Sequence, residues 1–234
     1  ITDVEKCEKE VELADKINVD LTETICKICK KINIKFVFIS TDHLFDGLNA
    51  FSTENSLVNP LNNYARTKVN AEKAVINANP EALIIRTNFF GWGTKYRKSF
   101  SDFIINNLRN NNQITLFENI YFTPIIISEL VNMVHELIDK NKNGIFNVCG
   151  NERISKYQFG IKISKLFSLK KSLIKKGSID QFKDLAKRPK DMSLSNNKVS
   201  KFLARPVISI EEQIAELFRQ ERTEIKVELE NIIE

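Results

Sequence analysis

Two side chains that can act together in proton transfer lie four residues apart in the segment Tyr64-Ala65-Arg66-Thr67-Lys68. Residues four apart share one face of a helix, so the phenol of Tyr64 and the ammonium of Lys68 are expected to be neighbours. A phenol has a pKa of about 10, and a fixed cation beside it lowers that pKa. Such a tyrosine can exchange a proton with a sugar oxygen. The Y-x-x-x-K pattern is common by chance, so its context decides its meaning.

A second polar group, Thr41 and Asp42, ends a short apolar run over 35–40 that is typical of a buried parallel strand. Ligands of open α/β sheets bind at the carboxyl ends of the strands. Thr41 can offer its hydroxyl to a substrate carbonyl, and Asp42 can offer its carboxylate to a sugar hydroxyl. The alternative is that both residues only begin a loop through local backbone hydrogen bonds.

The elements that must position these groups alternate between helix and strand. This order, with connections that suit right-handed crossovers, predicts a doubly wound parallel α/β sheet. The expected elements are a helix or broken helix pair over 4–31, a strand over 35–40, a loop over 41–60, a helix over 63–78 that Asn62 or Asn63 caps, and a strand over 82–86.

The second half of the chain has a mixed pattern, with no internal repeat and no flexible linker. It is therefore expected to share one unit with the first half. The expected elements are a helix over 99–110, a strand over 114–117, an extended segment over 121–127, a helix from a Ser128 cap to Asp139, a strand over 145–148, a helix from a Ser155 cap to about Leu169, and a C-terminal helix from about Ser209.

Composition excludes several classes of protein. The net charge is +5, from 35 Lys and Arg against 30 Asp and Glu, and the lysines are scattered, so nucleic acid is not an expected partner. The densest basic run, 165–176, is interpreted as a solvated face, although it could contact a phosphate. The longest apolar stretch, 120–127, is too short for a membrane span, and no signal segment opens the chain, so a cytoplasmic protein is expected.

Metal and redox chemistry are not predicted. The four cysteines include one C-x-x-C, Cys26 and Cys29, which has no second pair and no flanking histidine. We interpret it as two small apolar residues one helical turn apart. With only His43 and His135 in the chain, a histidine-rich metal site is excluded.

Glycine is scarce, with seven in 234 residues, and none forms a G-x-G-x-x-G phosphate loop. The chain also begins with Ile1 rather than Met. Its first residues lead straight into a helix, and from this and the Ile1 start we expect that a preceding segment is missing.

Three linked motifs resemble one family. They read S-T-D-x-x-F-D-G from Ser40, N-P-L-N-x-Y-x-R-T-K-x-x-x-E from Asn59, and R-T-N-F-F-G from Arg86. In this order and spacing they are similar to the extended short-chain dehydrogenase/reductases, and most of all to the dTDP-4-dehydrorhamnose reductase family. The resemblance runs nearly end to end, with the family's glycine-rich segment absent.

The resemblance implies a fold and a division of the chain. The expected fold is the C-terminal part of a Rossmann-type doubly wound parallel sheet with a smaller mixed α/β substrate-binding lobe. Residues 1–92 would be the remainder of the NAD(P)-binding domain, and 93–208 mainly the substrate lobe, with 127–150 returning to the sheet. Residues 209–234 would form the C-terminal helix.

The resemblance also implies a reaction, in which a nicotinamide cofactor reduces the C4 keto group of a nucleotide-linked 4-keto-6-deoxy sugar, as in dTDP-rhamnose biosynthesis. The cofactor would be NADP or NAD, with NADPH favoured, and a homodimer is plausible. The implied catalytic residues are Thr41, Tyr64 and Lys68, with Tyr64 as the proton donor. The implied substrate-binding residues are Thr41, Asp42 and Phe89, and the implied cofactor-binding residues are Thr2, Asn18, Tyr64, Lys68 and Arg86.

Departures from the family pattern concern the substrate. Phe89 stands where the family usually has tryptophan, and His43 where it has an aromatic residue such as tyrosine. His43 could hydrogen-bond a ligand or be a structural histidine, and we favour the structural role.

Two alternative functions remain open. One is a nucleotide-sugar epimerase or dehydratase of the same superfamily. The other is a non-catalytic regulatory subunit, like the beta subunit of methionine adenosyltransferase, which resembles these reductases.

Overall fold

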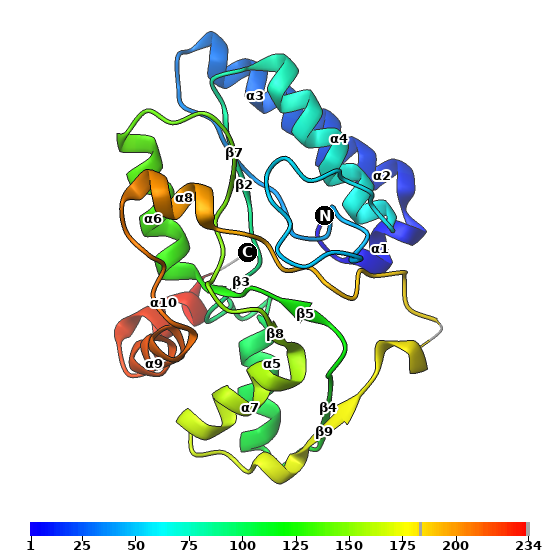
Figure 1. Ribbon diagram of the computed structural model, residues 1–234, viewed down its shortest axis with the longest axis vertical. Coiled ribbons are helices and arrows are strands. Elements are labelled where there is room, and N and C mark those ends of the chain that lie inside the picture. Colours follow the sequence, from blue (N-terminus) through cyan, green and yellow to red (C-terminus); the bar gives the residue numbers. More distant parts are fainter. Residues whose placement is uncertain (183, 233–234) are drawn as a thin grey trace.

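Three strands with nearly continuous apolar sequences form a parallel sheet at the centre of the upper part of the molecule (Figure 1). The computed structural model describes residues 1–182 and 184–232. The strands are β1 (Val37–Ile39), β2 (Leu83–Arg86) and β7 (Gly144–Asn147), in the order β1-β2-β7. Among the described residues, β1 has a strand neighbour on one side only.

Helices cover both faces of this sheet. Successive side chains of β2 point to opposite faces, so each face offers apolar side chains against which helices pack. Ile84 joins a buried cluster with Phe38 and with Val75 of α4 (Asn63–Ala78). Leu83 and Ile85 point to the other face, where α6 (Ile127–Asp139) and α8 (Asn197–Leu203) pack. The predicted doubly wound α/β arrangement is confirmed.

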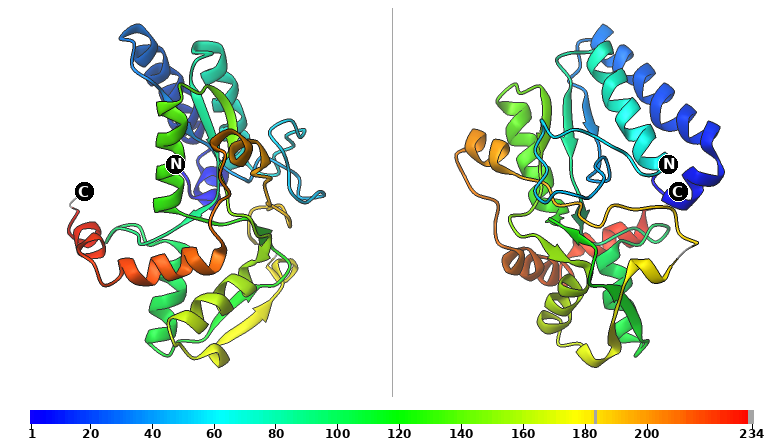
Figure 2. Two further views of the ribbon diagram at one scale, coloured as in Figure 1. Left: turned by 60° about the vertical axis from the view of Figure 1, so that its left-hand side comes forward. Right: turned by 45° about the vertical axis from the view of Figure 1, so that its right-hand side comes forward.

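The helical segment predicted over 4–31 is broken, as one of the two alternatives anticipated. It consists of α1 (Val4–Lys9), α2 (Val11–Asp15), a π-helical turn η1 (Lys16–Asp20) and α3 (Leu21–Lys31). Figure 2 shows α3 running alongside α4.

The side chains of α2, η1 and α3 that pack toward α4 are not the large apolar side chains of this segment. The buried residues are the small ones, Ala14, Asn18 and Cys26, whereas Ile28 and Ile32 are 52% and 56% exposed. Cys26 packs beside the Val75 carbonyl, and the described cysteines are unpaired. Cys26 and Cys29 thus lie one turn apart on α3, as expected, with Cys26 buried and Cys29 partly exposed.

The smaller lobe holds two helices and a parallel strand pair. Its elements are α5 (Phe100–Arg109), α7 (Lys156–Leu166), β4 (Ile114–Phe117) and β9 (Ile174–Gly177), with the short turns η2 (Lys171–Leu173) and η3 (Ile179–Gln181) around β9. Aromatic packing fills it, with Phe159 edge-on to Phe90 and Phe122. Gly160 allows α7 to approach β4, because a Cβ there would lie 2.2 Å from Leu116 Cδ1.

Short strand pairs connect the sheet to the lobe. They are β3 (Phe89–Phe90) with β6 (Ile125–Ile126), and β5 (Tyr121–Phe122) with β8 (Ile154–Ser155). The chain ends in α9 (Ile210–Gln220) and α10 (Glu224–Asn231), so the expected single C-terminal helix is divided, and its last two positions, 233–234, lie outside the described residues. No helix in the described part of the chain is both long and apolar enough to cross a bilayer.

Two of the predicted helix caps are present in the structure and one is not. Asn62 caps α4 by accepting from the Ala65 amide at 2.8 Å, and Ser155 caps α7, as predicted. Ser209, where the C-terminal helix was expected to begin, caps α9. The Ser128 cap is wrong. The N-cap is Ile126, two residues earlier, so α6 begins directly after β6, where the Ile126 amide donates to Gln213 Oε1 of α9 at 2.6 Å.

Candidate active site

Two loops at the carboxyl ends of β1 and β2 meet at Asp42. This carboxylate is 1% exposed and accepts from Asn88 Nδ2 at 2.6 Å. Its other oxygen faces the Thr41 hydroxyl at 3.3 Å, and the same hydroxyl accepts from the His43 amide at 3.3 Å. The local turn contacts of the second alternative are therefore present, and they lie at the edge of the sheet where ligands of such folds bind. Substrate binding by Thr41 and Asp42 stays a prediction.

Tyr64 lies in the first turn of α4, directly beside this loop. Its side chain is 9% exposed, and burial raises the pKa of its phenol to about 12, while the nearby Thr41 hydroxyl partly opposes the shift. This direction is opposite to the predicted lowering of the Tyr64 pKa. A phenol with this pKa is protonated at neutral pH.

The reason lies in the direction that Lys68 takes. Its ammonium donates to the Ile39 carbonyl at the end of β1 at 2.7 Å and lies 4.1 Å from the centroid of the Phe38 ring. Burial lowers the pKa of Lys68 to about 8. The i, i+4 spacing correctly predicts one helix face, but the lysine is held by the strand rather than by the phenol.

His43 forms one wall of the site. Its ring meets Tyr64 edge-on, with centroids 5.8 Å apart, and its Nε2 is 4.0 Å from Asp42. Burial lowers the pKa of His43, so the imidazole is neutral at pH 7, and its buried Nδ1 has no hydrogen-bond partner among the described residues. The histidine therefore has both a packing contact and an unused polar atom.

A cleft of about 560 Å³ opens beside Tyr64. The predicted Thr2 and Phe89 line it, and Phe89 is 50% exposed. Arg97 and Lys98, from the loop between β3 and α5, also line it. The sequence reading missed these two, although the basic cluster of the loop was a visible signal.

Two residues predicted to bind the cofactor, Asn18 and Arg86, make contacts that hold the fold together. Asn18 donates to Thr67 of α4 at 3.0 Å, which ties η1 to that helix. Arg86 is 4% exposed and forms an ion pair with Glu72 at 2.7 Å, which ties β2 to α4. The structure brings Thr2, Tyr64 and Phe89 to one cleft with Thr41 and Asp42 close by, and leaves Asn18 and Arg86 in the packing beneath.

The residues present fit the nicotinamide end of a dinucleotide. The cleft combines an exposed aromatic ring, Phe89, with a phenol and the hydroxyl of Thr2, which suits a flat ring with a polar edge. The described residues include no glycine-rich turn for a pyrophosphate, and they hold no cluster of three or more metal-ligating side chains.

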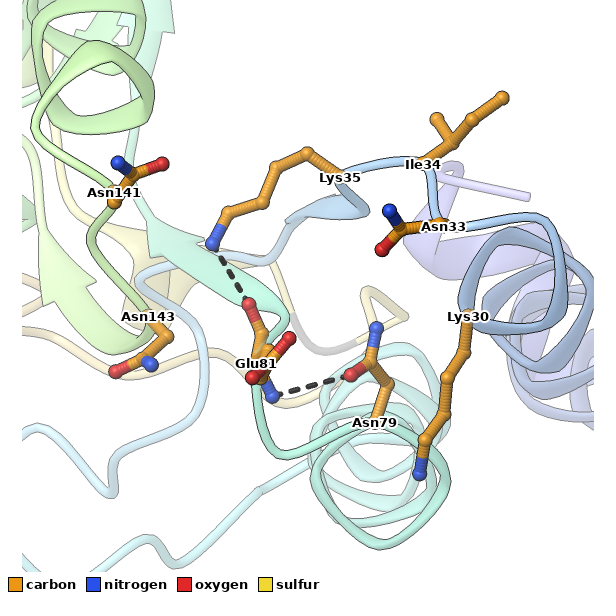
Figure 3. A pocket seen from close by; sticks show the side chains of 8 residues that line it. All are labelled: Lys30, Asn33, Ile34, Lys35, Asn79, Glu81, Asn141 and Asn143. Atoms are coloured by element: carbon orange, nitrogen blue, oxygen red, sulfur yellow. Dashed lines mark hydrogen bonds between the residues drawn. The ribbon is translucent and has the colours of Figure 1, made fainter.

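A polar cavity of about 390 Å³ lies at the opposite, amino-terminal edge of the sheet (Figure 3). Lys30 and Lys35 there donate to the carbonyls of Ala78 and Glu81, and Asn79 accepts from the Glu81 amide. These groups cap the ends of helices and strands, so we assign the cavity no chemistry.

Comparison with known proteins gives the relatives of this chain. The family described as the RmlD substrate binding domain matches residues 1–223. The probable low-salt glycan biosynthesis reductase Agl14 of Haloferax volcanii is 28% identical, over 92% of this chain and 73% of that protein. Methionine adenosyltransferase 2 subunit beta of Rattus norvegicus is 27% identical, over 82% of this chain and 59% of that subunit.

A solved structure of a dTDP-4-dehydrorhamnose reductase has a similar fold. A dTDP-4-dehydrorhamnose reductase from Bacillus anthracis, determined in complex with NADP, is 25% identical with a TM-score of 0.87, over 94% of this chain and 78% of that one. The fold and site define a class, the Rossmann-type NAD(P)-dependent sugar-nucleotide oxidoreductases. Within it, the chain belongs to the RmlD substrate-binding-domain family. The predicted family and fold class are confirmed.

Proposed function

We propose that this protein reduces the C4 keto group of a nucleotide-linked 4-keto-6-deoxy sugar, with Tyr64 as the proton donor. The observation that carries the proposal is the position of Tyr64, a phenol held protonated by burial and facing a cleft beside Thr41 and Asp42. The names of the Haloferax and Bacillus relatives support a reductase.

The cofactor and the three residues Tyr64, Thr41 and Asp42 have separate roles in the proposed reaction. A nicotinamide cofactor, when bound, supplies a hydride to C4. Tyr64 gives its hydroxyl proton to the former carbonyl oxygen, so the product is an alcohol and a phenolate remains on Tyr64. Thr41 holds that oxygen through a hydrogen bond, and Asp42 accepts from a neighbouring sugar hydroxyl.

The cofactor is NADP or NAD. The Bacillus structure contains NADP, and we favour NADPH for this chain. Thr2, Tyr64 and Phe89 would surround the nicotinamide, and Lys68 would hold the adjoining ribose. Cytoplasmic location, a homodimer, and cofactor contacts by Asn18 and Arg86 stay predictions.

The variant Tyr64→Phe tests this function. It removes one hydroxyl, and we expect turnover of a 4-keto sugar nucleotide to fall by about 10²–10⁴-fold, with binding of substrate and cofactor within about threefold of the unchanged protein. Turnover is measured by loss of NADPH absorbance, and binding by calorimetry. Tyr96 is 52% exposed and offers a matched control, Tyr96→Phe, which should not change turnover. Unchanged turnover in Tyr64→Phe would remove Tyr64 from the mechanism.

A second candidate function is that of a non-catalytic subunit, which the match to methionine adenosyltransferase 2 subunit beta supports. The two candidates differ in what Tyr64→Phe does. For a binding subunit, the unchanged protein binds a nucleotide without turnover, and the variant behaves in the same way. Product analysis separates reduction from the remaining alternative, epimerisation or dehydration of a nucleotide sugar.

A further inference from the structure

Tyr64 acquires a negative charge when it gives up its proton, and Lys68 is not directed at the phenol. The Lys68 ammonium is held by a carbonyl at the end of β1. The groups that do face Tyr64 are the ring of His43, which burial keeps neutral, and Asp42 and Cys7, whose negative forms raise the pKa of the phenol. A cation that faces the phenol must therefore come from another element.

The turn over residues 91–99, which joins β3 to α5, brings such a cation to the cleft beside Tyr64. We call it the Arg97 turn. The residues of the turn that line the cleft are Gly91, Trp92, Gly93, Arg97, Lys98 and Ser99. The charge of Arg97 lowers the pKa of the Tyr64 phenol, against the effect of burial. Arg97 thus shares a cavity with Tyr64 and favours its ionised form.

The guanidinium of Arg97 has no competing partner within residues 1–182 and 184–232. The side chain is exposed, and neither an ion pair nor a side-chain hydrogen bond occupies it there. The hydrogen bond that this residue does make is from its backbone amide to Thr94 Oγ1, at 3.1 Å. An exposed arginine is often no more than a solvated side chain, so the evidence for a role is the way in which the turn is held.

A buried carboxylate, that of Asp102 on α5, holds both ends of the Arg97 turn. Asp102 is 2% exposed, and its Oδ2 accepts from the amides of Gly93 and Ser99, each at 2.8 Å. The capping box of α5 accounts for the bond from Ser99 but not for the bond from Gly93, which ties the start of the turn to its end. The turn is also closed tightly, because a Cβ at position 93 would lie 2.2 Å from the Arg97 carbonyl oxygen. Asp102 therefore fixes the backbone from which Arg97 extends.

We propose that Arg97 stabilises the negative charge that Tyr64 acquires as it gives up its proton, and that Asp102 is the positioning residue that keeps Arg97 at the cleft. This assignment rests on the proposed function, since the phenolate forms only if Tyr64 is the proton donor. A fixed cation that faces a developing anion lowers the barrier, because it interacts more strongly with the transition state than with the neutral phenol. A guanidinium suits this role because it stays charged at high pH.

The first test needs no turnover. A fluorinated tyrosine, whose phenol is more acidic, replaces Tyr64 alone, and its ionisation in the full protein is followed by fluorine NMR as the pH is raised. We expect Arg97→Met to move the midpoint to higher pH by about half a pH unit or more, because an opposite charge is removed. Arg97→Lys should retain most of the effect. Lys95→Met, in the same turn but outside the cleft wall, is the control and should leave the midpoint unchanged.

The second test is kinetic and includes Asp102. We expect Arg97→Met to lower kcat for the 4-keto sugar nucleotide by about tenfold or more, with KM within about threefold, and Arg97→Lys to restore most of the loss. Asp102→Asn keeps the shape of the side chain and should lower kcat in the unchanged protein but have little further effect in Arg97→Met. A merely structural role of Asp102 would lower kcat equally in both backgrounds.

Several outcomes overturn the assignment. One is a midpoint or a kcat in Arg97→Met equal to that of the unchanged protein, and another is an equal shift of the midpoint in Lys95→Met. A higher KM for NADPH in Arg97→Met with kcat unchanged would make Arg97 a cofactor ligand instead. If the midpoint shifts as expected and no sugar is reduced, the effect of Arg97 on the phenolate stands and the proposed reductase fails. If reduction occurs and Arg97→Met changes neither the midpoint nor kcat, the reverse holds.

Discussion

At the scale of single residues, the protonation state of Tyr64 suits a proton donor. Burial raises the pKa of Tyr64 to about 12, so the phenol holds its proton throughout the neutral range. Reduction of a ketone consumes a proton, and a protonated phenol is the form that can supply it. The phenolate left behind is unfavourable in a buried site. Arg97 favours it from a distance, and the role we propose for Lys68, one turn along the same helix, is to offset its charge as well.

This assignment predicts a pH dependence. The pKa of Lys68 is lowered to about 8, so its ammonium is charged below that pH and loses its charge above it. We expect kcat for reduction to be constant from about pH 6 to 7.5 and to fall tenfold per pH unit well above pH 8. The measurement is a kcat profile at saturating substrate and cofactor.

The variant Lys68→Arg separates this explanation from others. A guanidinium stays charged throughout this range, so the plateau of kcat should extend to higher pH even if its height is lower. A falling limb at the same pH in Lys68→Arg would show that another group titrates.

At the scale of elements, a buried ion pair joins the catalytic helix to the sheet. Glu72 of α4 and Arg86 of β2 are each 5% exposed in their side chains, with Oε2 and Nη2 2.7 Å apart. Removing one partner leaves a buried charge without compensation, so we expect Glu72→Gln to lower the free energy of unfolding by about 3 kcal/mol. Urea denaturation of the variant measures this change.

An exposed pair provides the matched comparison. Glu23 and Lys27 on α3 are also 2.7 Å apart but 36% and 60% exposed. Glu23→Gln should change the free energy of unfolding by less than about 0.5 kcal/mol. Equal effects of the two variants would mean that burial of the Glu72–Arg86 pair is not what gives it its importance.

Elements were more predictable than side-chain directions. The capping residue Asn62 and the helical pattern that follows it predict α4 and place Tyr64 and Lys68 on it, because these are local features of the sequence. The sequence cannot show that the Ile39 carbonyl attracts Lys68, or that Gln213 caps α6, because both contacts join distant segments. The same limit applies to Asn18, which η1 turns toward Thr67.

At the scale of the whole molecule, alternation of helix and strand was enough to predict a doubly wound sheet, and the linked motifs identify the family. The composition of the active site was less accessible. Thr2, Tyr64 and Arg97 are far apart in sequence and line one cleft only in the folded chain.

The most direct test of the proposed reaction follows the hydride itself. The protein is incubated with a nucleotide-linked 4-keto-6-deoxy sugar and NADPH that carries deuterium at C4 of the nicotinamide, and the product is examined by NMR and mass spectrometry. We predict one deuterium at C4 of the sugar, a new hydroxyl at that carbon, and loss of the signal in Tyr64→Phe. A product without deuterium at C4, or one formed by epimerisation or loss of water, would contradict the assignment as a C4 reductase.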